Sequence, residues 1–472
     1  MFNSVLTTHL EKLIPRYTKR TKTSKFLKQN YHQVLADTQQ SGRFGNFNLS
    51  FKEIYYPIVG KHSLGSKLWD VDNNEYIDVR MGLGINLFGH NPHFIREVLT
   101  NQIEKGFQLG SQSQLAGEVA ELICELTGME RVTFINTGTE AVMTAIRLAR
   151  TVTGRDKIVI FSSSYHGHFD GVLAKAQIID GNLNIVPTAP GIPNSIIKDV
   201  LVLNYGNPQS LEVIKAHKQE LAAVLVVPVH TARFSFKLKT FLQELRQLTK
   251  ESGIPLIFDE MTTGFRIHPG GAQAYFNVEA DIATYGKVIG GGMPIGVIAG
   301  KACYMNAVDG GVWNYEDDSY PSAKTTFVAG TFCKHPLAMA AAQSVLEYLK
   351  KEGPNLQLQL NQRTSEFVQT LNSYFEKNEV PIRLDSFGSA FFFYYLENTV
   401  PTVDITVSEL MELFRYHLID RGVHIVGSSN YLSTAHTEQD INYIIQAVKD
   451  SVTELRQEGL LPRISCSSMA LI

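Results

Sequence analysis

The chain contains few cysteines and tryptophans and has almost no net charge. Of its 472 residues, 4 are cysteine and 2 are tryptophan, and Lys and Arg nearly balance Asp and Glu at a net charge of −3. This balance gives no electrostatic reason to expect nucleic acid as a partner. The cysteines lack paired or metal-type spacing, so we expect a reduced, cytoplasmic setting. They are Cys124, Cys303, Cys333 and Cys466.

Long apolar runs and ATP-type phosphate loops are also missing. No run reaches the roughly 18–20 apolar residues needed to cross a bilayer, and the first residues show no signal-peptide pattern. We therefore expect a soluble protein without a membrane partner. Ser or Thr never follows Gly-Lys, which occurs at 60–61, 286–287 and 300–301, and this excludes a P-loop.

Short apolar runs alternate with helical patterns between residues 130 and 300. Such runs are typical of strands buried on both faces, so we expect an α/β fold with a mainly parallel central sheet covered by helices. The expected strands are 131–135, 157–161, 222–227, 255–258 and 295–299. The tail from His335 combines a long helical pattern, alternating segments and a last helix near 438–458, which predicts a smaller α+β domain.

The expected domain organisation has four parts. They are a basic extension or docking segment at 1–48, the N-terminal part of the small domain at 49–105, a large domain at 106–334 and the C-terminal small domain at 335–472. The extension carries seven cations and no acid between Lys12 and Lys28. It is either a solvated helix or linker, or a docking surface for an acidic partner.

An acid and a lysine stand where two apolar runs end. Asp259 ends the run that starts at Pro255, and Lys287 follows 28 residues later, where a second run breaks into glycines. Such a pair suits pyridoxal phosphate, because the lysine amine forms an imine with the cofactor aldehyde and the carboxylate keeps the pyridine nitrogen protonated. Each residue alone has a plainer explanation, a strand cap for Asp259 and a surface turn for Lys287.

A phosphate-type element precedes this pair. The run 131–135 leads into Asn136-Thr137-Gly138-Thr139, and a helical pattern follows at once. Free N–H groups and the positive dipole end of a helix favour an anion, and a Thr hydroxyl adds a donor. The alternative is an ordinary helix cap formed by Thr139.

Two further segments could line the same site. Tyr165-His166-Gly167 follows a strand, where open sheets bind ligands, and an aromatic ring there could stack on a flat heterocycle. The alternative is a loop tyrosine beside a histidine satisfied by backbone. Gly330-Thr331 stands near a helix start and is either a second set of phosphate donors or a plain loop. We expect no metal at His166 and His168, because Gly167 separates them and no acid has matching spacing.

In this order and spacing the elements resemble class III aminotransferases of the type I pyridoxal phosphate-dependent transferase fold, over about residues 50–460. The nearest similarity is to glutamate-1-semialdehyde aminomutase and to aminotransferase domains of hybrid polyketide–nonribosomal peptide assembly lines. The motifs are Leu-Phe-Gly-His-Asn-Pro (87–92), Asn-Thr-Gly-Thr-Glu-Ala (136–141), Tyr-His-Gly (165–167), Phe-Asp-Glu-Met-Thr-Thr-Gly-Phe-Arg (258–266), Gly-Lys-Val-Ile-Gly-Gly-Gly-Met-Pro-Ile-Gly (286–296) and Ala-Gly-Thr-Phe (329–332). Segments 16–22, 266–276 and 330–341 look like the assembly-line branch.

The resemblance implies pyridoxal 5′-phosphate as the cofactor, bound in the large domain. The binding residues it implies are Gly138, Thr139, Tyr165, His166, Asp259, Lys287 and Thr331. Lys287 and Asp259 would be catalytic, the first through its imine and the second through the pyridine nitrogen. Tyr165 would stack on the ring. Family members are homodimers, so Thr331 would reach the phosphate of the neighbouring subunit's cofactor.

The resemblance also implies a reaction. Family members move an amino group from an amino acid, commonly glutamate or glutamine, to a keto or aldehyde acceptor. The assembly-line branch implies a β-keto acyl chain on an acyl or peptidyl carrier protein, whose acidic surface would suit the basic extension. The alternatives are an aminomutase acting on a free small molecule and a non-catalytic binding module.

The chain departs from the family at one position. The family usually reads Val-Glu-Pro-Val where this chain has Val-Val-Pro-Val at 226–229. Val227 thus replaces a carboxylate near the cofactor, which should alter local proton affinities and the orientation of a substrate carboxylate or amine. We expect chemistry at Lys287 to persist and donor preference to change.

Overall fold

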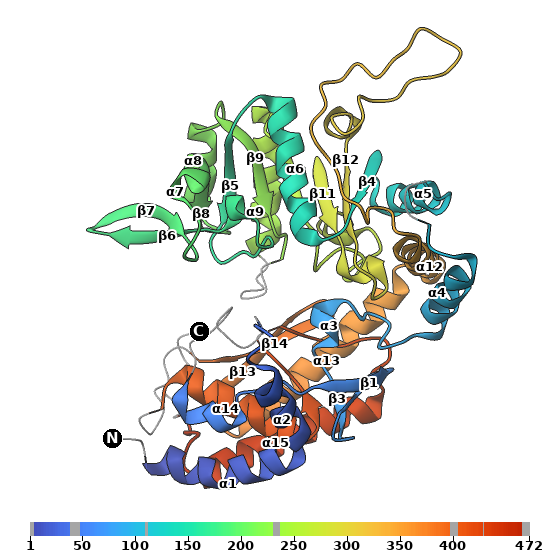
Figure 1. The fold of residues 1–472 in the computed structure, drawn as a ribbon. Helices are drawn as coiled ribbons and strands as arrows, with labels where there is room; N and C mark the ends of the chain where they lie inside the picture. The colour runs from blue at the N-terminus through green and yellow to red at the C-terminus, as the bar shows by residue number, and fades with distance from the viewer. Residues whose placement is uncertain are drawn as a thin grey trace. The chain divides into compact units, whose positions relative to one another are not determined.

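The computed structural model describes residues 4–37, 48–108, 112–229, 237–396, 405–427 and 429–464, so Cys466 and residues 38–47 of the basic extension lie outside the described part. The chain forms two compact units, drawn in Figure 1. Unit 1 joins Met1–Pro92 to Leu360–Ile472, and unit 2 is His93–Gln359. Within the described ranges, no helix is long and apolar enough to span a membrane.

Unit 2 is built on a seven-stranded sheet. Its strands are β4 (Arg131–Ile135), β5 (Lys157–Phe161), β8 (Val200–Leu203), β9 (Leu221–Val226), β10 (Leu256–Asp259), β11 (Ile282–Tyr285) and β12 (Gly296–Gly300). Their order is β4-β12-β11-β10-β9-β5-β8 (Figure 1). Only β12 runs antiparallel to its neighbours in this sheet, so the sheet is mainly parallel, as predicted. The carboxyl ends of the other strands therefore meet at one edge.

The strand sequences explain this arrangement. Every residue of β9, Leu-Ala-Ala-Val-Leu-Val, is buried, and so is every residue of β10, β11 and β12. Strands of a parallel sheet have helices on both faces and therefore form continuous apolar runs. The sequence pattern predicts β4, β5, β9, β10 and β12 correctly. The expected strands do not include β8 and β11, which have four residues each.

Helices cover the sheet of unit 2. They are α4 (His93–Lys105), α5 (Leu115–Thr127), α6 (Gly138–Thr153), α7 (Asn194–Ile197), α8 (Pro208–Ala216), α9 (Lys237–Ser252), α10 (Gly271–Phe276), α11 (Ala302–Met305) and α12 (Pro336–Glu352). Helix α6 packs across β9, β10, β11 and β12. Helix α12 packs on α4 and α5, so residues 335–359 belong to unit 2, whereas the sequence pattern begins the C-terminal small domain at 335.

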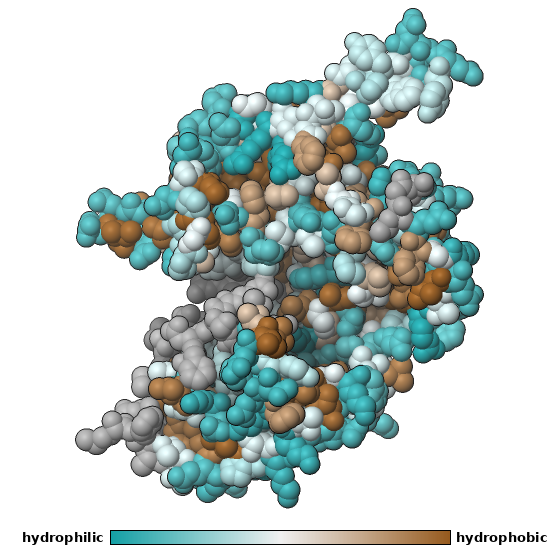
Figure 2. Space-filling model, in the orientation of Figure 1, coloured by the Kyte–Doolittle hydropathy of each residue, from teal (hydrophilic) through white to brown (hydrophobic). Residues whose placement is uncertain are grey.

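Two segments of unit 2 carry apolar side chains to the surface. Strands β6 (Ala174–Ile179) and β7 (Asn182–Pro187) form a hairpin in which Ile178 pairs with Leu183, and these residues are 74% and 70% exposed. Figure 2 shows hydrophobic residues on the surface of this hairpin. Between α11 and α12 the chain leaves the body of the unit as an extended loop (Figure 1). Its exposed aromatic residues are Trp313, Tyr315, Tyr320, Phe327 and Phe332. Exposed apolar groups that gather in this way are typical of partner-binding surfaces.

Unit 1 mixes helices with two small sheets, as expected for an α+β domain. The sheets have the orders β1-β2-β3-β15 and β13-β14-β16. The strands are β1 (Gly60–Leu64), β2 (Lys67–Asp70), β3 (Glu75–Asp78), β13 (Ile382–Phe387), β14 (Ala390–Tyr395), β15 (Val423–His424) and β16 (Asn430–Tyr431). The helices are α1 (Ser4–Arg20), α2 (Lys22–Tyr31), α3 (Met81–Gly84), α14 (Val407–Asp420), α15 (Glu438–Gln457) and α13 (Asn355–Lys377), which enters unit 1 at Leu360. Strands β2 and β3 form an antiparallel hairpin.

The basic extension folds as part of unit 1. One face of α1 is buried through Leu10, Leu13 and Tyr17, so this segment is not a solvated linker. Most of its cations pair within the unit. The ion pairs are Lys12–Glu458, Arg16–Asp420, Arg16–Glu454, Lys25–Glu53 and Lys28–Asp37. Lys19 and Lys22 are exposed, so only part of the positive charge is available to an acidic partner.

Candidate active site

Polar side chains from several strands gather at the carboxyl edge of the unit 2 sheet. Asp259 is the last residue of β10, Lys287 follows β11, and Asn136 follows β4. His166 lies in the loop after β5. Because these strands point the same way, their carboxyl ends share the edge at which open α/β sheets bind ligands.

Asp259 is buried and has a hydrogen-bond donor near each carboxylate oxygen. His166 Nδ1 lies 2.8 Å from Asp259 Oδ2, and the Met261 N–H donates to Oδ1 at 3.2 Å. Thr284 stands opposite Asp259 in the register of β10 and β11, with its hydroxyl 3.5 Å from Oδ1. An ionised carboxylate only accepts hydrogen bonds, which suits this set of donors.

His166 has a second buried nitrogen. Its Nε2 is shielded from solvent and has no hydrogen-bond partner among the described residues. Buried polar atoms are satisfied in nearly all proteins, so an unsatisfied one at a ligand-binding edge points to a group from outside the chain. We take this nitrogen as one contact that the site offers to a ligand.

Lys287 has an unusual backbone conformation and a fixed side chain. Its φ is +49°, a region in which residues other than glycine cost about 1–3 kcal/mol and that is found at functional sites. The ammonium donates to Thr262 Oγ1 at 2.7 Å. The side chain is half-buried, so the amine is held in place and remains within reach of a ligand.

Helix α6 begins at the same edge. The Thr137 hydroxyl accepts from the Glu140 N–H at 3.2 Å, and the Glu140 carboxylate accepts from the Thr137 N–H at 3.1 Å. The capping residue is therefore Thr137, and the alternative in which Thr139 caps the helix is wrong. Gly138 and Thr139 hold the first two helical positions, whose N–H groups find no acceptor within a helix. They can bind an anion.

Thr139 also meets the segment after β5. The His168 N–H donates to Thr139 Oγ1 at 3.3 Å. Gly167 has a φ of +87°, and a Cβ atom there would stand 2.5 Å from Thr139 Oγ1. Glycine is required at this position for both reasons. The helix start and the Tyr165-His166-Gly167 segment therefore lie side by side.

Met261 connects the helix start to the lysine. A Cβ atom on Gly138 would stand 2.8 Å from Met261 Sδ, and one on Gly286 would stand 2.9 Å from the same sulfur. The two glycines thus let one thioether approach both backbones. The start of α6 and the residue before Lys287 lie on two sides of a single side chain.

The structure places the remaining predicted residues on the surface of unit 2. Tyr165 is 51% exposed in the loop after β5. Thr331 is exposed in the turn before α12. The residue before it, Gly330, approaches Asn136 of the same chain, since a Cβ there would stand 2.7 Å from Asn136 Nδ2. The roles of Tyr165 and Thr331 in binding a cofactor stay predictions.

Three residues of the site are not predicted by the sequence motifs. Met261 and Thr262 touch the groups around Lys287, and Thr284 lies beside Asp259. Their only signal in the sequence is position, because Met261 and Thr262 stand two and three residues after Asp259 and Thr284 precedes Lys287 by three residues. Side-chain contacts between strands are not visible in spacing alone.

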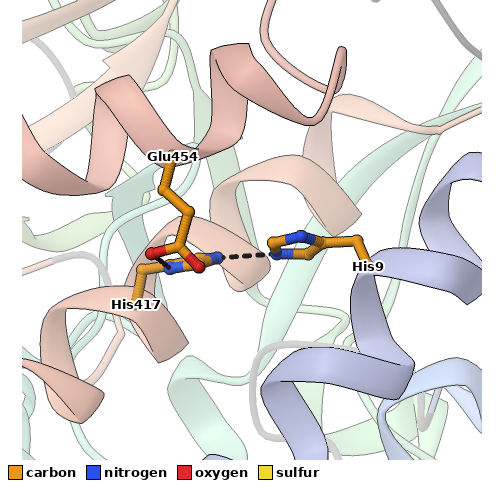
Figure 3. A group of neighbouring side chains, drawn as sticks. All are labelled: His9, His417 and Glu454. Atoms are coloured by element: carbon orange, nitrogen blue, oxygen red, sulfur yellow. Dashed lines mark hydrogen bonds and ion pairs between the residues drawn. The ribbon is translucent and has the colours of Figure 1, made fainter.

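A second polar cluster lies in unit 1, away from these residues in the sequence. His9 Nε2 lies 2.9 Å from His417 Nε2, and His417 Nδ1 lies 3.5 Å from Glu454 Oε2 (Figure 3). The three residues are close enough to hold a metal ion, but Glu454 already pairs with Arg16 and Arg421, which offset its charge. Burial lowers the pKa of His9 to about 4 and also lowers the pKa of His417, so the pair is neutral at pH 7. We interpret the cluster as a contact that fixes α1 against α14 and α15.

The edge of the unit 2 sheet offers what pyridoxal phosphate requires from a protein. It provides an amine at Lys287, a buried carboxylate at Asp259, and unpaired N–H groups for a phosphate at the start of α6. His166 Nε2 adds a buried polar contact. The fold and the site together define a pyridoxal phosphate-dependent transferase of fold type I.

Comparison with known proteins identifies the family. The chain matches the aminotransferase class-III family over residues 51–429 and belongs to it. It is 36% identical over 390 residues to glutamate-1-semialdehyde 2,1-aminomutase 2 of Lachnoclostridium phytofermentans, with 80% of this chain and 87% of that protein covered. It is 26% identical to the β-phenylalanine aminotransferase of Variovorax paradoxus, with a TM-score of 0.80 and 98% and 100% of the two chains covered. A transaminase solved with PLP bound is also 26% identical, with a TM-score of 0.79 and 93% and 99% coverage.

These findings confirm the expected family, fold type and cofactor. The chain is a pyridoxal phosphate-dependent enzyme of the class III aminotransferase family. The family implies amino donors and keto acceptors as its substrates. The alternative of a non-catalytic binding module is not supported. The part played by each residue is not tested by these similarities and belongs to the proposals below.

Proposed function

We propose that this enzyme exchanges an amino group and a carbonyl within one free small molecule, as an aminomutase of the glutamate-1-semialdehyde type. The observation that carries this proposal is the 36% identity to a protein with that name, spread over 80% of the chain. The arrangement of Lys287, Asp259 and the start of α6 at one sheet edge is compatible with it. The assembly-line reaction favoured by the sequence motifs becomes the second candidate.

Each residue of the site has a proposed task. The cofactor, when bound, supplies an electron sink that stabilises negative charge on the substrate carbon beside the nitrogen. Lys287 takes up and returns the proton on that carbon as general base and acid, since its amine is fixed and only half-buried. Asp259 would accept a hydrogen bond from the protonated pyridine nitrogen of the cofactor and keep the ring charged. The N–H groups of Gly138 and Thr139 bind the phosphate.

The experiment is incubation of the cofactor-loaded enzyme with glutamate-1-semialdehyde and no amino donor. A mutase forms an isomer of unchanged mass and releases no keto acid, because the nitrogen never leaves the reacting pair. Product that forms only after glutamate is added, together with 2-oxoglutarate, would contradict the mutase and indicate transfer between two molecules. Lys287→Ala is the matched control that removes the chemistry and keeps the fold.

The second candidate is transfer from an amino acid to a β-keto acyl chain on a carrier protein. The similarity of segments 266–276 and 330–341 to the assembly-line branch favours it, as do the exposed cations Lys19 and Lys22. Reversal of these two charges should lower turnover of the carrier-bound substrate and spare a free thioester mimic. Reversal of the exposed Lys351 in α12 is the control for charge alone. An equal loss of turnover with both substrates would show that these two cations do not bind a carrier protein.

We also propose that the enzyme works as a homodimer in which each subunit lends Thr331 to the other's phosphate site. The exposed aromatic loop that precedes Thr331 supports this, because it would be buried by a second copy. A mixture of Lys287→Ala and Thr331→Ala subunits tests it. Mixed dimers regain one complete site, and activity should rise above that of either variant. No gain on mixing would assign Thr331 to its own subunit.

A further inference from the structure

Glu260 is a fully buried acid directly beside Asp259. Its exposed fraction is 0%, and its carboxylate accepts hydrogen bonds from the Ala272 N–H at 2.7 Å, the Gln273 N–H at 3.2 Å and the Thr263 hydroxyl at 2.8 Å. The first two donors belong to the first turn of α10. A buried carboxylate with three donors is an organised feature of the fold, since an unsupported charge would be strongly unfavourable there.

The backbone around Glu260 is shaped to admit this contact. Gly271 has a φ of +69°, and a Cβ atom there would stand 2.5 Å from Glu260 Oε2. The start of α10 reaches the carboxylate only because this residue is glycine. A second glycine, Gly264, closes the turn by donating its N–H to the Glu260 carbonyl at 2.8 Å. The Glu260 N–H in turn donates to the Thr284 carbonyl of β11 at 3.0 Å.

One path leads from Glu260 to the lysine amine. The turn at 260–264 contains Thr263, which is tied to the Glu260 carboxylate, and Thr262, whose hydroxyl accepts from Lys287 Nζ at 2.7 Å. Thr262 and Thr263 are adjacent, so a carboxylate that fixes one restricts the other. The position of the ammonium therefore depends on the turn that Glu260 organises.

A second path reaches β11, the strand that precedes the lysine. Gln273, whose N–H bonds to Glu260, donates its side-chain amide to the Tyr285 hydroxyl at 3.0 Å and accepts from the Ala280 N–H at 2.8 Å. Tyr285 is buried and precedes Lys287 by two residues. The same carboxylate is thus connected to both sides of the lysine.

We propose that Glu260 is a positioning residue of the amine-transfer site, because its buried carboxylate fixes the Lys287 side chain through Thr262 and Tyr285. This positioning role rests on the proposed function, and all the contacts that support it lie within unit 2. Glu260 acts on Lys287 through other residues, namely Thr262, Thr263, Gln273 and Tyr285.

The ionisation of Glu260 gives this role a measurable signature. Burial raises the pKa of Glu260, the three hydrogen bonds lower it and the charge of Asp259 raises it, which together bring the pKa to about 7. The other titratable groups around this turn are Tyr285, Arg266 and His268. Above pH 7 the carboxylate is ionised and accepts all three donors. Below pH 7 it carries a proton and loses part of its acceptor capacity, which should weaken its bonds to the turn that holds Thr262.

The test measures the Lys287 amine in the protein without cofactor, so it does not depend on catalysis. Acylation of lysines by a small reagent is followed by mass spectrometry, and the rate at Lys287 is divided by the rate at Lys301, which pairs with Asp281. In the wild type this ratio should be about threefold to tenfold higher below pH 7 than above it, which is the size expected for the contribution of one ordinary hydrogen bond. In Glu260→Gln the step near pH 7 should vanish.

A second variant keeps the proposal testable if Glu260→Gln does not fold. Thr262→Val removes the acceptor of the ammonium and keeps the side-chain shape, so its ratio should be high at every pH. A wild-type ratio without a step near pH 7, or a step that survives in Glu260→Gln, would overturn the positioning role. Borohydride labelling of the cofactor-loaded wild type tests the amine-transfer function separately, so the two failures are distinguishable.

Discussion

His166 Nδ1 lies 2.8 Å from Asp259 Oδ2, and the two side chains are 1% and 3% exposed. The pair joins the loop after β5 to the end of β10, two strands that are not neighbours in the sheet. It holds one oxygen of the carboxylate in place and turns His166 Nε2 away from Asp259. The chemistry we propose for Asp259 depends on this orientation.

Replacement of the histidine should therefore impair catalysis. His166→Phe keeps a ring and removes the donor, and we expect kcat/KM to fall about 10-fold to 100-fold, as for loss of a hydrogen bond to a charged group. His168→Phe is the matched control, because His168 is exposed and contributes only its backbone N–H to the site. Equal steady-state kinetics of the two variants would show that His166 does not contribute to catalysis.

Gly167 provides a test of the phosphate site. Gly167→Ala introduces a Cβ atom 2.5 Å from Thr139 Oγ1 at a φ of +87°, which should displace the start of α6 and weaken cofactor binding at least about tenfold. Gly154→Ala is the control, since Gly154 has a φ of +67° and no atom within 4 Å of the new methyl group. Both variants carry backbone strain, and only the first crowds Thr139. Equal cofactor dissociation constants, measured by fluorescence titration, would show that this contact does not shape the site.

The His9–His417 pair predicts acid-sensitive attachment of α1. The pKa of His9 is lowered to about 4 and that of His417 is also lowered, mainly by burial, so the folded state favours the neutral rings. The stabilisation is complete above the unfolded pKa of about 6.5 and is lost as the pH falls toward 4. The charged groups that face the pair are Arg16, Arg421, Glu454 and Glu458.

The measurement is the free energy of unfolding of wild type and His9→Gln across this pH range. The difference between the two free energies should shrink as the pH falls. Acid removes the stabilisation by the neutral histidine pair from the wild type, whereas the substitution removes it at every pH. Lys61→Gln, an exposed change in the same unit, is the control. A constant difference from pH 7 to 4 would show that the histidine pair does not titrate as described.

Much of the fold and the central chemistry could be predicted from the sequence, because both depend on strong local signals. β9 and β10 are continuous apolar runs, and Asp259 and Lys287 stand where such runs end. Motifs of this kind can be recognised in a sequence because burial and backbone geometry restrict each position separately.

The remaining features depend on contacts between distant segments. The cap of α6 is Thr137 instead of Thr139, which only the reciprocal bond with Glu140 decides. The buried face of α1 is masked in the sequence by the cations around it, although Leu10, Leu13 and Tyr17 have helical spacing. The hydrogen bond from Lys287 to Thr262 depends on how the turn at 260–264 folds back, and residue spacing does not predict it.

Val227 predicts an altered substrate preference. It follows β9 directly, and its neighbour Val226 pairs with Phe258, so position 227 lies near Asp259 at the sheet edge. Val227→Glu adds a negative charge there and should raise KM for substrates with a carboxylate about tenfold, while amines without one change less. Val227→Gln is the neutral control of similar shape. A KM for carboxylate substrates that is the same in both variants would show that charge at this position does not select the substrate.

The proposed chemistry requires a covalent link between the cofactor and Lys287. Purified enzyme is loaded with pyridoxal phosphate, reduced with borohydride, digested and mapped by mass spectrometry. We predict that the pyridoxyl group is found on Lys287, and that Lys287→Arg, which keeps the charge, carries none. A label on another lysine, or no label on Lys287 in fully loaded enzyme, would contradict the assignment of this site.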